Sequence, residues 1–543
     1  MQTRETLYNT YVNAQKNNPD NVAIFTRDGE AITHGRLLDE TDRAAAGLLK
    51  FKTSDVFKVG IISASSYQEA VILLAASKIG AISKYIDFTK NVMEIGTSVA
   101  ESSISILAMG AEFLPMEPFI NPSRLPVIVF DDISTDQPNY LTYQKLIKMK
   151  SAVTCTPADY QDNTCAVIIN SSGTTGTPKP IELSDRAINA AVDKMKKTDY
   201  PLTENNLLLK IIPSQIGMGL ITTLYTGLIL GVPVIFLGGN SPKESIELFV
   251  GLLNGYNAFL ESHHLSKDTK LLIFGSPMYF RTLYQLFDNL QDLSFIGCML
   301  AGGSAMSKEE LETMDTAFAS KGCSVPILNG YGQNEMAGAV TLNQINKNRR
   351  GSAGIAVDET DLLIVDLTSG NPVERNTVGK ILERSESLFV QYENMKEETL
   401  SSFVTDQTGK EWFNTNDVGY IDEDGFLFIT GRTSRIIIRF DMKVSLDKIE
   451  SKILMSKYIK EVGVISLLNI PYDNTVVFVT LNDEYSKDSI SHDTILADIQ
   501  ASQNPLTELE AVDKLIIVDA LPYRSSGKID YLELKKQAEA MKG

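Results

Sequence analysis

Cysteine is scarce in this sequence. Its 543 residues include four cysteines, Cys155, Cys165, Cys298 and Cys323, and no two of them form a Cys-x-x-Cys pair. So few scattered thiols cannot build a disulfide framework, and their sparseness is typical of a reducing compartment. We interpret them as packing residues and expect a cytoplasmic protein.

Positive charge is also in short supply. Lysine and arginine total 50 against 68 aspartates and glutamates, which gives a net charge of −18. A surface of this sign disfavours nucleic acids and anionic membranes as general partners, because both are polyanions. Any site for an anionic ligand must therefore be assembled locally.

Two further absences concern membranes. The N-terminal segment lacks an apolar core, so neither a signal peptide nor an N-terminal anchor is expected. Residues 211–242 lack any charged side chain, and their length would allow a membrane span. Prolines and glycines divide this stretch, at Pro213, Gly217, Gly219, Gly227, Gly231 and Pro233. We therefore expect a buried helix-sized piece followed by a short strand, Val234–Leu237, and no transmembrane segment.

The organisation of the chain predicts an α/β protein of at least two domains, because its length exceeds one compact core. No fixed-period repeat is present. Apolar strand-like runs such as Lys58–Ile62 alternate with helical patterns such as 33–48, which is typical of parallel sheets covered by helices. After about Gly351 shorter alternating runs indicate a β-rich part. The portion from Thr433 onward is long enough for a small separate domain.

One stretch combines an apolar run with a small, hydroxyl-rich loop. Ile168, Ile169 and Asn170 lead into the sequence SSGTTGTPKP at 171–180, and an amphipathic segment at 185–192 leaves it. Glycines let backbone N–H groups approach a ligand, the hydroxyls add donors, and Lys179 adds a positive charge, so the loop suits a polyphosphate. It is not a Walker A element, because prolines flank the lysine. A solvated linker is the alternative, which the flanking elements disfavour.

Further polar segments stand at the ends of apolar runs, far apart in the sequence. They are Ala301–Ala305, Asn329–Glu335, Trp412–Tyr420, Gly431–Arg432 and Leu521–Lys528. In this order and spacing, together with the loop, they closely resemble the adenylate-forming superfamily, which includes AMP-forming acyl-CoA synthetases, adenylation domains and luciferases. The resemblance spans nearly the whole chain.

The resemblance implies a fold and a reaction. The fold is a large N-terminal domain, 1–432, of two layered α/β subdomains plus a β subdomain, followed by a small mobile α+β domain, 433–543. In the reaction a carboxylate attacks the α-phosphate of ATP, which releases pyrophosphate and gives an acyl adenylate. A thiol of coenzyme A or of a carrier protein's phosphopantetheine then takes the acyl group.

The resemblance also assigns roles to residues. Lys528 is the expected catalytic lysine at the α-phosphate, and Lys179 and Asn334 are expected to assist at the phosphates. Glu335 is the expected ligand of Mg²⁺, a cation that prefers carboxylate and phosphate oxygens, although a loop glutamate alone would be read as surface. The expected ATP contacts are Ser171, Ser172, Gly173, Thr174, Thr175, Gly176, Lys179, Gly302, Gly303, Ser304, Tyr331, Gly332, Asn334, Asp417, Arg432 and Lys528.

Within this set Tyr331 is expected to stack on adenine and Asp417 to accept hydrogen bonds from the ribose. The acyl pocket is expected to involve Gln215, Ile216, Gly302 and Gly303. No aspartate is placed to pair an α-amino group, and the apolar lining favours a medium or long apolar acid or an aryl acid.

The sequence departs from the family pattern at several positions. Asn334 replaces a threonine, Asn416 and Pro180 replace glycines, and Ser434 replaces the hinge aspartate or lysine. Asp441 replaces a glycine beside the expected pantetheine channel, which bears on thioester formation more than on adenylation.

Three functions follow as hypotheses. The first is an acyl-CoA synthetase, and the second is a stand-alone enzyme that loads a separate carrier protein, since no carrier follows Lys528 in the sequence. The third is an ATP-binding paralogue without turnover, which the replacements Asn334, Ser434 and Asp441 motivate.

Overall fold

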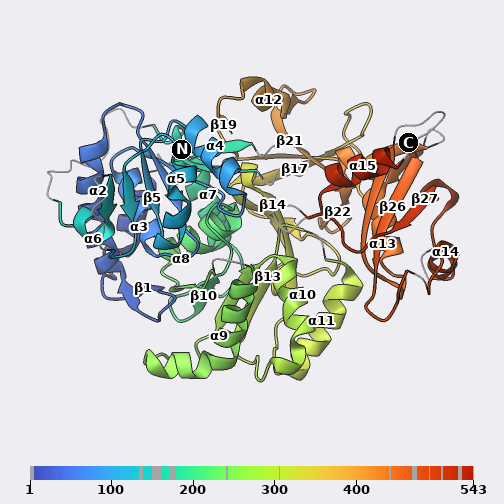
Figure 1. Ribbon diagram of the computed structural model, residues 1–543, viewed down its shortest axis with the longest axis horizontal. Helices are drawn as coiled ribbons and strands as arrows, with labels where there is room; N and C mark the ends of the chain where they lie inside the picture. The colour runs from blue at the N-terminus through green and yellow to red at the C-terminus, as the bar shows by residue number, and fades with distance from the viewer. Residues whose placement is uncertain are drawn as a thin grey trace.

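The computed structural model describes residues 5–133, 139–149, 161–171, 179–239, 242–304, 306–439, 442–467, 474–487, 489–502, 505–523 and 529–541. Two helix-covered sheets, a five-stranded antiparallel sheet and a C-terminal portion with two small sheets make up the molecule (Figure 1). The predicted α/β class, with a large N-terminal region and a smaller C-terminal one, is confirmed.

The first α/β part is built on an eight-stranded sheet in the order β19-β9-β8-β4-β3-β5-β6-β7. Pairing is parallel from β8 through β7 and antiparallel at β9 and β19. The strands are β3 (Lys58–Ile62), β4 (Ile82–Tyr85), β5 (Ile106–Met109), β6 (Val127–Val129), β7 (Tyr140–Thr142), β8 (Cys165–Asn170), β9 (Pro180–Ser184) and β19 (Gln391–Tyr392). Successive residues of β3 and β5 enter two different core clusters, so both faces of this sheet are buried.

The second α/β part is built on a nine-stranded sheet in the order β16-β15-β14-β13-β12-β10-β11-β1-β2. The run from β14 to β1 is parallel, and antiparallel strands extend both edges. The strands are β1 (Val22–Phe25), β2 (Ala31–Thr33), β10 (Leu207–Lys210), β11 (Val234–Phe236), β12 (Leu271–Gly275), β13 (Ile296–Ala301), β14 (Ile327–Gln333), β15 (Gly338–Leu342) and β16 (Ile355–Ala356).

Helices of the N-terminal region cover these sheets, and one core cluster takes residues from both sheets. The α-helices are α1 (Leu7–Gln15), α2 (His34–Leu48), α3 (Gln68–Lys78), α4 (Val92–Glu101), α5 (Glu117–Ile120), α6 (Tyr143–Leu146), α7 (Asp185–Lys196), α8 (Thr226–Leu230), α9 (Pro242–Ser262), α10 (Pro277–Gln285) and α11 (Lys308–Ser320). Figure 1 shows α2, α3 and α6 at one side of the molecule and α9, α10 and α11 together at another.

The third part is an antiparallel sheet in which β17 (Thr360–Val365), β18 (Gly379–Ser385), β21 (Glu411–Ile421) and β20 (Phe403–Thr405) follow one another, and β22 (Leu427–Arg432) pairs with β21. Helix α12 (Lys396–Ser401) precedes β20. Because β22 ends at Arg432 directly opposite Asp417 of β21, the register of this sheet brings two predicted site residues together.

The C-terminal portion lies at the far end of the molecule from α2 and α6 (Figure 1). It contains the hairpin β23 (Ile436–Arg439) and β24 (Met442–Ser445) and the sheet of β25 (Ile459–Leu467), β26 (Asn474–Leu481) and β27 (Lys514–Ile517). Its α-helices are α13 (Leu446–Ile453), α14 (His492–Gln500) and α15 (Tyr531–Ala540). This portion also contains the 3₁₀ turns Thr433–Arg435 and Glu508–Glu510. The 3₁₀ turns of the N-terminal region are Leu49–Phe51, Ala111–Met116, Phe287–Asn289 and Asn334–Met336.

Several predicted elements are found at their predicted places. The helix predicted over 33–48 is α2, which begins after Thr33 because the Thr33 hydroxyl accepts a hydrogen bond from the backbone N–H of Arg36 at 3.2 Å. The strand predicted at Lys58–Ile62 is β3. The uncharged stretch from residue 211 is largely buried, and it forms a π-helix (Met218–Tyr225), α8 and β11.

The structure also bears on the expectations about membrane segments and cysteines. Within the part of the chain that the structure describes, no helix has the length and apolarity to cross a membrane. Cys165, Cys298 and Cys323 are free thiols, and the last two lie in the core.

Candidate active site

The hydroxyl-rich loop is closed at its base by two hydrogen bonds between Ser171 and Lys179. The Ser171 N–H donates to the Lys179 carbonyl at 2.8 Å, and the Lys179 N–H donates to the Ser171 hydroxyl at 2.9 Å. The loop joins β8 to β9 in an antiparallel hairpin, so a strand stands between it and the amphipathic helix α7 that was expected next. The predicted residues Ser172, Gly173, Thr174, Thr175 and Gly176 lie outside the described residues.

The Lys179 side chain contacts Tyr392, a residue that belongs to none of the recognised motifs. The Lys179 ammonium lies 4.7 Å from the centroid of the Tyr392 ring, which is a cation–π distance. The Tyr392 hydroxyl in turn donates to Glu335 Oε1 at 3.1 Å. Tyr392 thus connects the loop lysine with the predicted magnesium ligand.

The strand that carries Tyr392 is fixed by its neighbour Glu393. The buried Glu393 carboxylate pairs with Lys58 and with Lys84, the latter at 2.5 Å. The backbone N–H of Glu393 donates to the Pro180 carbonyl at 2.8 Å. Burial alone would raise the pKa of Glu393, but the hydrogen bonds from the two lysines hold it below its ordinary value. The ionised carboxylate therefore ties the end of β19 to lysines of β3 and β4, while the backbone N–H of Glu393 bonds to β9. No sequence signal marks so short a strand.

Glu335 is a buried carboxylate in the 3₁₀ turn Asn334–Met336. Burial raises the pKa of Glu335, while the Tyr392 hydroxyl and the charges of Arg432 and Lys179 partly offset that rise. Among the described residues, no group of three or more His, Cys, Asp or Glu side chains could hold a metal ion. Mg²⁺ needs only one or two carboxylates when phosphate oxygens complete its shell, so Glu335 fits that donor set.

Asn334 connects three segments through its side-chain amide. Its Nδ2 donates to the Asn170 carbonyl at 2.7 Å, at the end of β8. Its Oδ1 accepts from the Gly217 N–H at 3.0 Å, next to the π-helix. The amide therefore joins the stem of the hydroxyl-rich loop to the segment expected at the acyl pocket.

Asp417 contacts three neighbouring side chains. Its Oδ2 accepts from the Tyr331 hydroxyl at 2.6 Å and from Gln333 Nε2 at 2.6 Å, and its Oδ1 lies 3.0 Å from Arg432 Nε. Burial, and next the nearby Asp417 carboxylate, raise the pKa of Tyr331 well above its ordinary value, so the phenol is a donor. Gln333 is a site residue to which sequence reasoning gives no role, although it stands inside a recognised motif.

The backbone conformation of Asn416, the residue before Asp417, accounts for one departure from the family pattern. Asn416 adopts a left-handed backbone with φ of +59°. Glycine enters this region freely, and asparagine is among the residues that tolerate it best. The replacement of the usual glycine by Asn416 is therefore compatible with the same local backbone.

The predicted glycine segments form a wall beside β14. Gly302 is buried at the end of β13, whereas Gly303, with φ of +88°, and Ser304 are exposed. A Cβ on Gly332 would stand 1.9 Å from the Gly338 carbonyl oxygen, so only glycine allows β14 and β15 to approach here.

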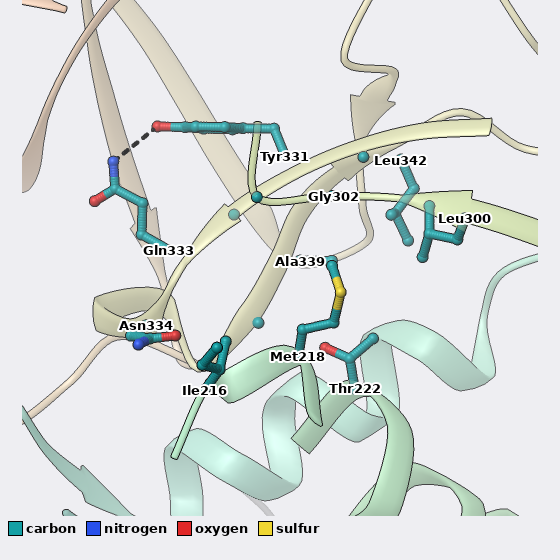
Figure 2. Close-up of a pocket in the computed structure, with 14 residues that line it drawn as sticks. Ile216, Met218, Thr222, Leu300, Gly302, Tyr331, Gln333, Asn334, Ala339 and Leu342 are labelled. Carbon is teal, nitrogen blue, oxygen red and sulfur yellow. Dashed lines mark hydrogen bonds between the residues drawn. The ribbon is translucent and has the colours of Figure 1, made fainter. Parts of the chain in front are cut away.

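These segments enclose one pocket with a volume of about 90 Å³ (Figure 2). Of the predicted residues, Ile216, Gly302, Gly303, Tyr331, Gly332 and Asn334 line it. Gln215 is buried but is not among the lining residues. The pocket is also lined by residues to which the sequence assigns no role: Met218, Thr222, Leu300, Gly330, Gln333, Gly338, Ala339 and Leu342. Of these, Gly330 and Gln333 stand inside the motif Asn329–Glu335.

The junction after Arg432 is held by a second arginine, Arg435. Its guanidinium lies 2.6 Å from Glu450 Oε1 and 3.8 Å from the centroid of the Tyr531 ring, and the Tyr531 hydroxyl donates to Glu450 Oε2 at 3.0 Å. Asp441 and the predicted catalytic Lys528 lie outside the described residues, as does the side chain of Ser434.

Comparisons with known proteins identify the family of this chain. A family model described as AMP-binding enzyme matches residues 12–393. A probable CoA ligase of Humulus lupulus is 28% identical over 397 residues, which cover 70% of this chain and 62% of that protein, less than two thirds of its length. The 4-coumarate–CoA ligase 3 of Oryza sativa subsp. japonica is 22% identical over 534 residues, which cover 95% of this chain and 89% of that one.

The fold matches a solved structure over almost its whole length. The crystal structure of ATP-bound MatB from Rhodopseudomonas palustris superimposes with a TM-score of 0.81 at 20% identity, covering 98% of this chain and 99% of that one. The chain therefore belongs to the AMP-binding enzyme family, and its predicted membership of the adenylate-forming, AMP-forming acid–thiol ligases is confirmed.

Proposed function

We propose that this protein uses ATP to convert a carboxylic acid into an acyl adenylate, releases pyrophosphate, and transfers the acyl group to coenzyme A. The observation that carries the proposal is the meeting of distant segments at one pocket. Asn334 contacts both the stem of the phosphate loop and Gly217, and Asp417 contacts Tyr331, Gln333 and Arg432. These groups offer donors, cations and a carboxylate to a nucleotide beside an apolar pocket.

The nucleotide roles follow from these contacts. We propose that the Tyr331 ring stacks on adenine and that Asp417, fixed by three neighbours, accepts the ribose hydroxyls. Lys179 and Arg432 both act electrostatically on Glu335, which supports a phosphate position near this carboxylate. Fixed cations at the phosphates stabilise the charge that develops when the two anionic reactants meet.

Magnesium is part of the proposal. Glu335 would hold it together with phosphate oxygens, and the ion would neutralise charge on the leaving pyrophosphate. The chain itself contributes Tyr392, whose hydroxyl orients the Glu335 carboxylate.

Coenzyme A is the proposed acceptor because the hop and rice relatives are both CoA ligases by name. A separate carrier protein is the alternative acceptor, and a silent ATP-binding paralogue is the alternative to catalysis. We further propose that the boundary between the large domain and a mobile C-terminal domain falls between Arg432 and Thr433, where β22 ends. The three free thiols support the cytoplasm as the compartment.

Exchange of labelled pyrophosphate into ATP tests the first half-reaction. We expect exchange that depends on added acid and on magnesium, and no exchange across a broad panel of acids would overturn the proposal. Coenzyme A and a phosphopantetheinylated carrier protein, each supplied separately, then distinguish the two acceptors.

Lys528→Ala tests the proposed role of the C-terminal domain. We expect exchange to fall below detection while ATP binding, measured by calorimetry, changes little, because this lysine is proposed to act at the α-phosphate. The matched control is Lys535→Ala, which removes an exposed lysine from α15. Equal exchange in the wild type and Lys528→Ala would contradict the assignment.

A further inference from the structure

The inner end of the pocket is lined mainly by apolar side chains. Met218, Leu300, Ala339 and Leu342 supply an apolar lining, and none of the described residues that line the pocket is charged. A second carboxylate or an ammonium on the bound acid would lose its water here without gaining a partner. Burial of an unpaired charge costs several kcal/mol or more, which excludes such acids on energetic grounds.

One hydroxyl interrupts this apolar lining. Thr222 lies on the π-helix, and its Oγ1 would stand 3.1 Å from a Cβ built on Gly338, so it lies against the β15 wall. Figure 2 shows the hydroxyl turned to the side on which Met218 lies. Within the described residues we find no hydrogen bond to this hydroxyl. It is therefore available to a neutral polar group on the tail of the acid.

Met218 limits the room at this end. Its side chain runs from the π-helix toward Gly302 (Figure 2), and its Cε would lie 2.3 Å from a Cβ built on Gly302. With Met218 in this place the pocket holds about 90 Å³. A cavity of roughly 150 Å³ accommodates benzene, so we expect a ring to require movement of this flexible side chain.

We propose that this pocket selects a monocarboxylic acid with a compact, uncharged tail that bears one hydrogen-bonding group, which Thr222 recognises, while Met218 sets the upper size. The inference rests on the proposed function, because it assumes that this pocket receives the acyl group. It makes Thr222 and Met218 specificity-determining residues.

A series of five-carbon acids tests the proposal with matched shapes. In the exchange assay we expect kcat/KM to rank 4-oxopentanoate about tenfold above pentanoate, and pentanoate more than 100-fold above glutarate. Thr222→Val, which keeps the shape and removes the hydroxyl, should reduce the ratio of 4-oxopentanoate to pentanoate to about one.

The control for this variant is Thr223→Val, which makes the same change at a buried neighbour that does not line the pocket. It should leave the ratio as in the wild type. Met218→Ala should raise the ratio of 3-phenylpropanoate to pentanoate about tenfold. Glutarate as good as pentanoate, or a Thr222→Val variant that keeps the wild-type ratio, would overturn the proposal.

A binding measurement separates this inference from the proposed function. Acyl sulfamates of adenosine, made with the pentanoyl, 4-oxopentanoyl and glutaryl groups, bind without turnover, and calorimetry should give the same order of affinities. The wrong order overturns the inference even if exchange occurs. Correct order without exchange for any acid supports the inference and counts against the proposed catalysis.

Discussion

The proposed nucleotide half and the proposed acyl half of the site use polar groups in opposite ways. In the nucleotide half, Asp417 has three partners, and both ends of the Asn334 amide are engaged. In the acyl half, the side chains of Leu300 and Ala339 offer only carbon, and Thr222 is the one polar side chain at the inner end among the described lining residues. Directional contacts suit a ligand of constant chemistry, whereas an apolar wall selects by size and can change with one side chain.

The largest expected effect comes from breaking the polar half at Asp417. Asp417→Asn keeps the shape but weakens the contacts to Tyr331, Gln333 and Arg432 and removes a charged acceptor from the proposed ribose position. Hydrogen bonds to charged groups are worth about 1.5–3 kcal/mol each, so we expect kcat/KM for ATP to fall about 100-fold to 1,000-fold in pyrophosphate exchange.

The control for Asp417→Asn is Asp361→Asn. Asp361 is exposed on β17 of the same sheet and pairs with Arg384 at 2.5 Å on the surface. Surface ion pairs contribute little, so exchange should stay near the wild-type rate. Similar losses in both variants would mean that the sheet, and not the site, had been damaged.

A smaller effect is expected where the two halves meet. Asn334→Ala removes the bonds to Asn170 and Gly217, and we expect exchange to fall about 10-fold to 100-fold with a higher KM for both ATP and the acid. Asn334→Thr restores the residue of the family pattern and should recover part of the activity, since a hydroxyl replaces one of the two contacts. A change confined to the KM for ATP would show that Asn334 serves the nucleotide half alone.

Much of the fold was predictable because local pattern and tertiary structure agree. The spacing of apolar residues in α2 and the short apolar run of β3 are such cases. The strand β9 was missed because Pro180 and the loop read as an extended turn, and the two-residue β19 is too short to carry a period. The hairpin with β8 creates β9, and pairing with β9 across about 200 residues of sequence creates β19.

The same difference between local sequence pattern and tertiary contacts holds for the site. The segments that contain Asp417, Tyr331 and Asn334 are visible in the sequence as polar groups after apolar runs, and the family resemblance predicts roles for these residues. The roles of Tyr392 and Glu393 could not be predicted, since they depend on contacts with Lys179 and with Lys84. Met218 and Thr222 lie in an uncharged stretch that reads as core, and only the π-helix and its packing show that they line a pocket.

The acyl half should respond to a change of size at Ala339. Ala339→Val adds two methyl groups to a pocket that is already small, and overpacking of this kind usually costs about 1–3 kcal/mol. We expect the KM for the acid to rise about tenfold, with the effect on the KM for ATP much smaller. Steady-state exchange with each substrate varied in turn measures both, and an equal rise in the two constants would contradict the separation of the halves.

The antiparallel sheet that carries Asp417 also contains a carboxylate without partners, Glu383 on β18. It is fully buried, and neither oxygen has a hydrogen-bond partner within the described residues. Burial raises the pKa of Glu383 to about 7, which nearby Ser385 and Lys194 only partly oppose. Two carboxylates on neighbouring strands thus differ in their contacts, because Asp417 has three side-chain partners whereas Glu383 accepts no hydrogen bond within the described residues.

Glu383 should affect stability and not catalysis. Because its pKa is higher in the folded state, the folded protein binds more protons than the unfolded chain as pH rises from about 4.5, and stability falls until pH exceeds about 7. This loss amounts to about 3 kcal/mol. Glu383→Gln should remove that part of the pH dependence, so the stability of the variant rises relative to the wild type between pH 5 and pH 8.

Trp412, the only tryptophan of the chain, lies on β21 beside this position and reports the unfolding of the sheet in urea. The control is Glu411→Gln, which changes an exposed residue next to Trp412 on β21. An equal pH response of stability in both variants would show that Glu383 is not the titrating group.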